Sequence, residues 1–539
     1  MKYQVLRLLA VMLALAVMAA ACGSDSNPGA VATAADANSS QGDAASDESA
    51  SDEAASDEAA SDEAASDEAA APAVALDEAT EVEDGGAETA SFGELEARWA
   101  DARAATVAKI KANGYGLDGD ILTGPGGWTV DFSECPSDWN NVAGVKDGVL
   151  TLGLSIVQSG AGAVAGNLGV GMKAYYDWVN ENGGIGPDGL QIELIQKDDA
   201  YVASQTQENV AELLQTVDPF YITTVGSPNT FAVREALNDA CVPHPWSITG
   251  HQAWGDPVNY PWTDGILLSY ATEAQLWGSY IEQHFDEPVK VAALVMDNDF
   301  GLAYETGFGS FAAQSDMIES VQFIRHDPAA ATLTNEMTTL AGGNPDVFIA
   351  MTTNNPCLLA LQEADRSGLT ETTEVRFLPS VCKPVSAYAG PAGEASDGWL
   401  IFGGGLKDNT DVQYADDTYI SWMNGVIEEA GLDTSVSFTG TGFGLIGWPS
   451  VEVLRVAAEL DGGLTRSNYM VALRSFEGQH PMLLDAIVFA QNGLEDAYWL
   501  EGSDLSRFDF ASQSWIVEGG VIDLNGESGL CEWDPETGC

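Results

Sequence analysis

The sequence predicts an α/β fold made of two doubly wound parallel-sheet lobes. From Val149 onward, apolar strand candidates alternate with helix candidates, and glycine-rich turns separate them. Such alternation is typical of a parallel sheet that is covered by helices on both faces. The pattern begins again at Val289, so we expect two such modules in succession.

The elements of each module can be assigned in chain order. The first module has expected strands at 150–157, 190–195 and 219–225 and expected helices at 172–180, 204–216 and 230–240. The second has expected strands at 289–296, 321–325, 346–350 and 375–378 and expected helices at 304–315, 332–341 and 357–367. Before the modules lies an extension, residues 92–147, with a helical pattern over 92–112 and then a turn-rich segment. We expect no chemistry in this extension.

Residues 1–21 have the pattern of an export signal. Lys2 and Arg7 precede an apolar run that is too short to span a bilayer as a mature helix, and alanines precede Cys22. Cys22 after small residues resembles the lipobox of bacterial lipoproteins. That resemblance implies cleavage before Cys22, lipidation of its thiol, and a protein anchored to the cell membrane on the extracytoplasmic face. The alternative is an ordinary secretory signal with an incidental cysteine.

The charge of the chain is strongly acidic. Its 539 residues include 82 Asp and Glu against 20 Lys and Arg, a formal net charge of −62, so nucleic acid is not an expected partner. Residues 22–91 contain Ser-Asp-Glu-Ala-Ala repeats and no Lys or Arg. Since this segment lacks apolar surface to offset the entropy of ordering, we expect a disordered tether. A transient helix is the alternative.

Several motifs follow one another along the two modules. The stretch from Thr151 to Gly160 leads to Gly183-Gly184 and then to Asp198-Asp199. Further motifs stand beside later elements: Val225-Gly226-Ser227 before a helix, Cys241-Val242-Pro243 before a strand, Phe300-Gly301 after the strand from Val289, and Pro345-Asp346-Val347. The series covers about residues 149–524. It resembles the branched-chain amino-acid-type periplasmic binding proteins, the substrate-binding subunits of ABC importers.

The resemblance implies a type I fold, in which two lobes are joined by a three-strand hinge and close on a small molecule. Lobe 1 would hold residues 148–268 and 403–475, and lobe 2 would hold residues 269–402 and 476–524. Residues 525–539 would form a cysteine-containing tail. We therefore expect a monomer that binds a small-molecule ligand and works with an ABC transporter permease.

In lobe 1, ligands are expected beyond the carboxyl ends of the strands, at helix N-termini. Gly226, Ser227 and Asn229 occupy such a place, with plain N-capping of the following helix as the alternative. Ser247 and Thr249 match the family's second polar loop. Ser159, which follows the first strand and begins the turn that opens the first helix, is also expected to bind the ligand.

In lobe 2, Phe300 stands where the family commonly has an aromatic ring against the ligand, with core packing as the alternative. Asp297 and Tyr304 are weaker candidates. Where amino-acid-binding members carry Tyr, this chain has Ala165, and residues 377–383 lack the family's acid for the ligand ammonium group. An unpaired buried ammonium is costly, which argues against a simple amino acid unless Asp297 replaces that acid. Lys383 would instead favour an acidic or uncharged ligand.

The cysteines fit an oxidising compartment, and the sequence does not choose among their pairings. Six remain besides Cys22: Cys135, Cys241, Cys357, Cys382, Cys531 and Cys539. Cys357 with Cys382 and Cys531 with Cys539 are plausible disulfides. No CxxC pair or helically spaced His pair occurs, so no metal site is expected.

Parts of the sequence are also compatible with two functions other than solute binding for an importer. Gly160, Gly162 and Gly166 after a strand, with Asp198 ending the next, allow a dinucleotide-dependent oxidoreductase. The export signal argues against it, because NAD is a cytoplasmic cofactor, and neither a G-x-S-x-G nor an H-E-x-x-H motif occurs. We therefore expect no enzyme and no cofactor. A ligand sensor that signals to a membrane kinase would use the same lobes.

Overall fold

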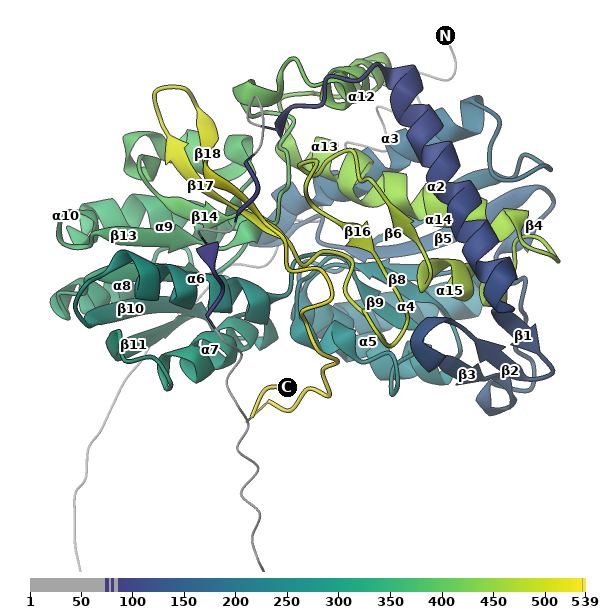
Figure 1. Cartoon of the computed structure of the whole chain (residues 1–539), viewed down its shortest axis with the longest axis horizontal. Coiled ribbons are helices and arrows are strands. Elements are labelled where there is room, and N and C mark those ends of the chain that lie inside the picture. The colour runs from purple at the N-terminus through teal and green to yellow at the C-terminus, as the bar shows by residue number, and fades with distance from the viewer. Residues whose placement is uncertain (1–72, 77–78, 82–85, 536) are drawn as a thin grey trace, which may run out of the picture. The chain divides into compact units, whose positions relative to one another are not determined.

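The computed structural model describes residues 73–76, 79–81, 86–535 and 537–539 (Figure 1). The expected export signal, Cys22 and the Ser-Asp-Glu-Ala-Ala repeats lie outside the described residues. Within the described part of the chain, no helix is long and apolar enough to cross a membrane.

The first sheet is centred on β5. Its strands are β4 (Val145–Lys146), β5 (Val149–Ile156), β6 (Gln191–Asp198) and β7 (Ile222–Thr224). Strand β5 pairs in parallel with β6 on one side and with β7 on the other, whereas β4 is antiparallel. A parallel bridge between Val225 and Ile248 extends the layer to β8 (His244–Ser247), which pairs with β9 (Thr263–Gly265). The intervening helices are α3 (Asn167–Glu181), α4 (Ala203–Thr216) and α5 (Ser227–Asp239).

The second sheet has seven strands in the order β11-β10-β12-β13-β14-β17-β18. Its strands are β10 (Val289–Met296), β11 (Ile318–His326), β12 (Val347–Met351), β13 (Val375–Leu378), β14 (Leu400–Phe402), β17 (Ser503–Asp509) and β18 (Ser514–Ile522). The first five are mutually parallel, and β17 and β18 add an antiparallel edge. Its helices are α6 (Tyr270–His284), α7 (Asp299–Ala312), α8 (Thr334–Gly342), α9 (Asn355–Arg366), α10 (Leu369–Thr372) and α11 (Gly390–Ala392).

The chain passes between the two sheets three times. It leaves the first sheet after β9 to form α6, returns after β14, and reaches the second sheet again at β17. The returning segment forms α12 (Thr418–Glu429), α13 (Ser437–Thr441), the π-helical turn η11 (Gly442–Gly447), α14 (Trp448–Glu459) and α15 (Arg466–Leu473). This topology confirms the predicted fold of two doubly wound lobes.

Glycine allows the returning segment to pack closely on α3. A Cβ atom at Gly442 would lie 2.0 Å from the carbonyl oxygen of Leu168. Likewise, a Cβ atom at Gly171 would lie 2.0 Å from the carbonyl oxygen of Thr439. Any larger residue at either position would push these backbones apart.

The N-terminal extension adds a long helix and a small sheet to the first lobe. Helix α2 (Phe92–Asn113) begins with a capping box between Ser91 and Glu94 and ends at Gly114, which confirms the helical pattern predicted over 92–112. It packs against α14 and against the short strand β15 (Glu477–Gly478), which pairs with β16 (Phe489–Ala490). The segment expected to be only turn-rich forms an antiparallel sheet of β1 (Gly116–Asp118), β2 (Ile121–Thr123) and β3 (Thr129–Asp131).

Three disulfides join the six cysteines of the described chain. Cys357 pairs with Cys382 and Cys531 pairs with Cys539, which confirms both expected pairs. The third disulfide, between Cys135 and Cys241, ties the N-terminal extension to the loop that precedes β8. The sequence alone did not predict this pairing.

Candidate functional site

A cavity of about 100 Å³ lies between the two lobes, where the three crossing segments meet. Lobe 1 contributes Ala165, Leu168, Val225, Ile248, Phe438 and Leu445. Lobe 2 contributes Tyr270, Phe300, Thr353, Ser380, Val381 and Pro384. The crossing segments contribute Leu267, Leu268, Gly403, Gly404, Leu406 and Leu500. The remaining lining residues are Tyr201, Gly226, Asn354 and Thr441. We call this cavity the cleft pocket.

The cleft pocket is apolar, and no residue that lines it carries a charged side chain. Its polar lining groups are hydroxyl and amide groups, such as those of Thr353, Asn354, Ser380 and Thr441. Because an ionised ligand group needs a partner when it leaves water, this lining favours a ligand whose body is apolar.

Two lining residues are held in strained backbone conformations. Tyr201 has φ of 62° and Asn354 has φ of 58°, and residues other than glycine rarely adopt positive φ angles. The Tyr201 ring covers Gly226, where a Cβ atom would lie 2.4 Å from the ring. Strain of this kind persists only where the surrounding structure fixes it, and it is concentrated at ligand sites.

Two of the expected ligand residues line the cleft pocket, namely Gly226 at the start of α5 and Phe300 in the first turn of α7. Phe300 enters this turn because the Asn298 side chain accepts hydrogen bonds from the N–H groups of Phe300 and Gly301. Helix α7 therefore begins five residues earlier than the sequence predicted.

The polar residues expected in lobe 1 lie behind the pocket wall. The hydroxyl groups of Ser227 and Thr249 are buried and 2.7 Å apart, hydrogen-bonded to each other. The capping alternative is wrong, because Gly226 is the N-cap of α5 and both Ser227 and Asn229 lie within the helix. The Asn229 amide is buried and has no hydrogen-bond partner among the described residues.

The other expected residues do not line the pocket either. Ser247 is buried, with its hydroxyl 3.5 Å from His244, and Ser159 is exposed, three residues beyond the end of β5. Asp297 forms an ion pair with Arg325 at 3.0 Å. Lys383 is buried in an ion pair with Asp504, also at 3.0 Å. Their roles in ligand binding remain predictions that this placement does not support directly.

Sequence reasoning missed a buried carboxyl group beside the pocket. Glu273, on α6, accepts hydrogen bonds from Tyr304 at 2.7 Å and from the Ser380 N–H and hydroxyl groups at 2.6 and 2.8 Å. Burial raises the pKa of Glu273 to about 8, against the opposing effect of these hydrogen bonds. The available signal was an acid among the apolar and aromatic residues at the start of α6. Tyr304, an expected ligand residue, binds this carboxyl group.

A disulfide fixes two of the pocket loops. Cys357 lies in the first turn of α9, three residues after Asn354, and Cys382 lies two residues after Ser380. Both cysteines are fully buried. The disulfide thus ties together the loops that bring Asn354 and Ser380 to the pocket. In the described ranges, no cluster of three or more His, Cys, Asp or Glu is arranged to hold a metal ion.

Comparison with known proteins identifies the framework of this site. Residues 149–404 match a family model described as periplasmic binding protein. This part of the chain belongs to the periplasmic binding protein family. The family's description implies an extracytoplasmic location. No curated protein matches the chain.

Solved periplasmic binding proteins share the fold at low sequence identity. A branched-chain amino acid ABC transporter structure from Thermus thermophilus with bound valine has a TM-score of 0.59 and 17% identity, covering 69% of this chain and 96% of its own. A fatty acid ABC transporter substrate-binding protein from Thermomonospora curvata has a TM-score of 0.58 and 18% identity, covering 73% and 96%. An R. palustris solute-binding protein in complex with 4-hydroxybenzoate has a TM-score of 0.56 and 15% identity, covering 69% and 95%. These likenesses confirm the type I fold.

Proposed function

We propose that this periplasmic binding protein is the solute receptor of an ABC importer, and that its solute is a small apolar molecule without an ammonium group. The observation that carries the proposal is the cleft pocket, which lies between the lobes and has no charged lining residue. Contacts made by both lobes exist only when the lobes are closed, so ligand binding stabilises the closed arrangement. An importer would recognise the closed, ligand-bound form.

Two ionisable groups beside the pocket, Glu273 and Lys383, argue against an amino acid as the solute. Glu273 is mostly uncharged at neutral pH, and its oxygens already accept hydrogen bonds from Tyr304 and Ser380. Lys383 is engaged with Asp504. An ammonium group in the pocket would therefore lose its hydration without gaining a carboxylate partner, which costs several kcal/mol.

A carboxylate or a carbonyl group has partners in the pocket. Gly226 precedes α5 and Asn354 precedes α9, so the N-termini of both helices lie at the pocket. Helix N-termini offer unpaired N–H groups and the positive end of the helix dipole. The proposed solute therefore places an apolar body against the leucines and aromatic rings and an oxygen-bearing group at these termini. The fatty acid and 4-hydroxybenzoate of the two neighbouring proteins have this chemistry.

The proposed function includes the membrane anchor and the transport partner. Cleavage before Cys22 and lipidation of its thiol would hold the protein at the extracytoplasmic face of the membrane, with residues 22–91 as the tether. The ligand-bound lobes would then dock on an ABC transporter permease. The protein would act as a monomer with lobes divided as the resemblance implies.

Calorimetry with matched solutes tests the proposed function. The full chain is stripped of bound solute with its disulfides intact, then titrated with leucine, 4-methylpentanoate and 4-methylpentanamide. The last two keep the carbon skeleton of leucine and lack its ammonium group. We expect at least one of them to bind tenfold or more tightly than leucine. Leucine binding that is as tight or tighter would contradict the proposal.

A further inference from the structure

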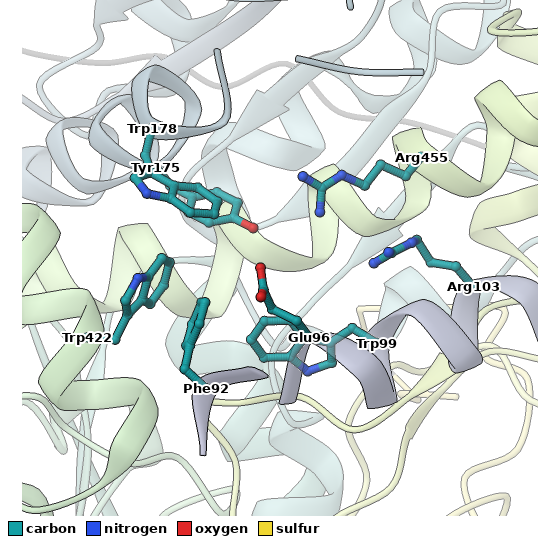
Figure 2. Close-up of a pocket in the computed structure, with 8 residues that line it drawn as sticks. All are labelled: Phe92, Glu96, Trp99, Arg103, Tyr175, Trp178, Trp422 and Arg455. Atoms are coloured by element: carbon teal, nitrogen blue, oxygen red, sulfur yellow. The ribbon is translucent and has the colours of Figure 1, made fainter. Parts of the chain in front are cut away.

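A second pocket lies on the outer side of lobe 1, away from the cleft pocket. It lies between α2 of the N-terminal extension and the helices α3, α12 and α14, and its volume is about 50 Å³. Figure 2 shows the residues that line it. Only two of them, Tyr175 and Trp178, belong to the part of the chain that matches the family. We call it the α2 pocket.

Aromatic rings form one side of the α2 pocket. Phe92 stacks on Trp422 at a centroid distance of 4.4 Å, and Trp178 meets Trp422 edge-on at 5.0 Å. These three rings are partly exposed, whereas Trp99 and Tyr175 are buried behind them. Faces of tryptophan and phenylalanine rings carry negative potential, which attracts a cation placed against them.

Two polar groups point into the same space. In Figure 2 the Glu96 carboxylate projects to the centre of the pocket, and the Tyr175 hydroxyl points toward it from the opposite side. Neither group has a hydrogen-bond partner among the described residues. Burial raises the pKa of Tyr175. The phenol therefore stays neutral and offers an acceptor, while Glu96 offers a negative charge.

Two arginines close the far end of the pocket, and both are engaged. Arg103 and Arg455 each donate to one oxygen of the Glu452 carboxylate, which is 1% exposed. This buried acid compensates part of their charge and holds both guanidinium groups beside it. The Glu96 carboxylate also interacts electrostatically with Arg455, so the two arginines and the two acids together carry no net charge. A cation would therefore lie on the side of Glu96 that faces the rings, away from the guanidinium groups.

We propose that the α2 pocket binds a small organic ammonium group. Aromatic faces with a carboxylate are the usual surroundings of alkylammonium ligands in proteins. The strongly acidic chain would also raise the local concentration of cations at its surface. The group can belong to a free amine or to a lysine side chain of a partner protein. Binding at this pocket does not depend on the solute of the cleft pocket.

Ligand-observed NMR titration of the full chain tests this site. The probes are choline, its neutral isostere 3,3-dimethylbutanol, and Nα-acetyl-lysine N-methylamide. We expect choline or the lysine derivative to bind at least tenfold more tightly than the neutral isostere, and the tighter of the two indicates the source of the ammonium group. Equal binding of choline and the isostere, or no binding of either cation, would overturn the proposal.

Variants separate the pocket from general surface charge. Glu96→Gln should weaken cation binding at least tenfold, while Asp101→Asn, which removes an exposed carboxylate from the same helix, should change it less than twofold. Trp422→Leu should also weaken it, with near-ultraviolet circular dichroism as the check on folding. Solute affinity of the cleft pocket should not change in Glu96→Gln. Cation binding that survives Glu96→Gln would contradict the site.

Discussion

The backbone N–H of Ser380 donates a hydrogen bond of 2.6 Å to the carboxyl group of Glu273, across 107 residues of sequence. This contact joins α6, whose first residue Tyr270 lines the cleft pocket, to the loop that carries Ser380 into the pocket wall. A single buried carboxyl group therefore positions two parts of the wall. Its protonation state should affect both stability and solute binding.

Stability should fall with pH through the titration of Glu273. Its folded pKa of about 8 lies above the reference value of 4.5 because burial disfavours the charged form. Between these two pKa values the folded state binds more protons than the unfolded state. The contribution of protonated Glu273 to the free energy of unfolding is therefore complete below pH about 4.5 and is lost as pH rises through 8. In Glu273→Gln, stability relative to the natural protein should rise by a few kcal/mol between about pH 5 and 8.5.

Chemical unfolding at a series of pH values measures this difference. Glu282→Gln, on the same helix, serves as the control for losing one carboxylate. A difference between Glu273→Gln and the natural protein that stays constant across this pH range would show that Glu273 is ionised throughout.

Gly226→Ala should weaken solute binding. The residue has φ of 92°, and an added Cβ atom would lie 2.4 Å from the Tyr201 ring in the pocket wall. Gly393→Ala is the matched control, because Gly393 has φ of 69° and open space around it. Both variants should lose about 1 kcal/mol of stability from backbone strain. Only Gly226→Ala should lower solute affinity in calorimetry. Equal solute affinities of the two variants would contradict the assignment of Gly226 to the wall of the cleft pocket.

Removing the Cys357–Cys382 disulfide should loosen the pocket. It closes a loop with a sequence separation of 25, for which chain entropy gives about 3 kcal/mol of stabilisation. The paired change of both cysteines to Ala should therefore lower the unfolding midpoint and the solute affinity together. The same change at Cys531 and Cys539, whose separation is 8, should cost less stability and leave affinity intact. Unchanged solute affinity in the variant without Cys357 and Cys382 would show that this disulfide does not stabilise the cleft pocket.

Lys383→Met should destabilise the protein by about 3–5 kcal/mol, because it leaves the buried Asp504 carboxylate without its partner. Lys383→Met combined with Asp504→Asn should recover more than half of this loss, as measured by urea unfolding. The amide oxygen that Asp504→Asn introduces can still accept the hydrogen bond that the Gly405 N–H donates to the natural carboxylate. A direct ligand role for Lys383 would instead appear as lost solute affinity with little loss of stability.

Much of the fold could be predicted from the sequence, because buried parallel strands are continuous apolar runs. The expected strands at 289–296 and 375–378 coincide with β10 and β13. The start of α7 could not be predicted in this way, since it depends on the Asn298 side chain capping the helix.

The candidate site was predicted less well, because sequence position does not show which way a side chain points. Ser227 and Thr249 were expected to meet a ligand; their hydroxyl groups are hydrogen-bonded to each other and neither residue lines the cleft pocket. Glu273 was missed because its partners lie far away in the sequence. The N-terminal extension was expected to carry no chemistry. Its residues Phe92 and Glu96 nevertheless line an aromatic pocket together with residues of α3, α12 and α14.

The distance between the lobes on addition of solute tests the central claim most directly. Nitroxide labels at Glu208 on α4 and Thr338 on α8, both exposed, report this distance by double electron–electron resonance. The tightest-binding solute of the calorimetric panel should convert a longer or broader distribution into one narrow, shorter distance. A distribution that stays the same at saturating solute would contradict a receptor that works by closing its cleft.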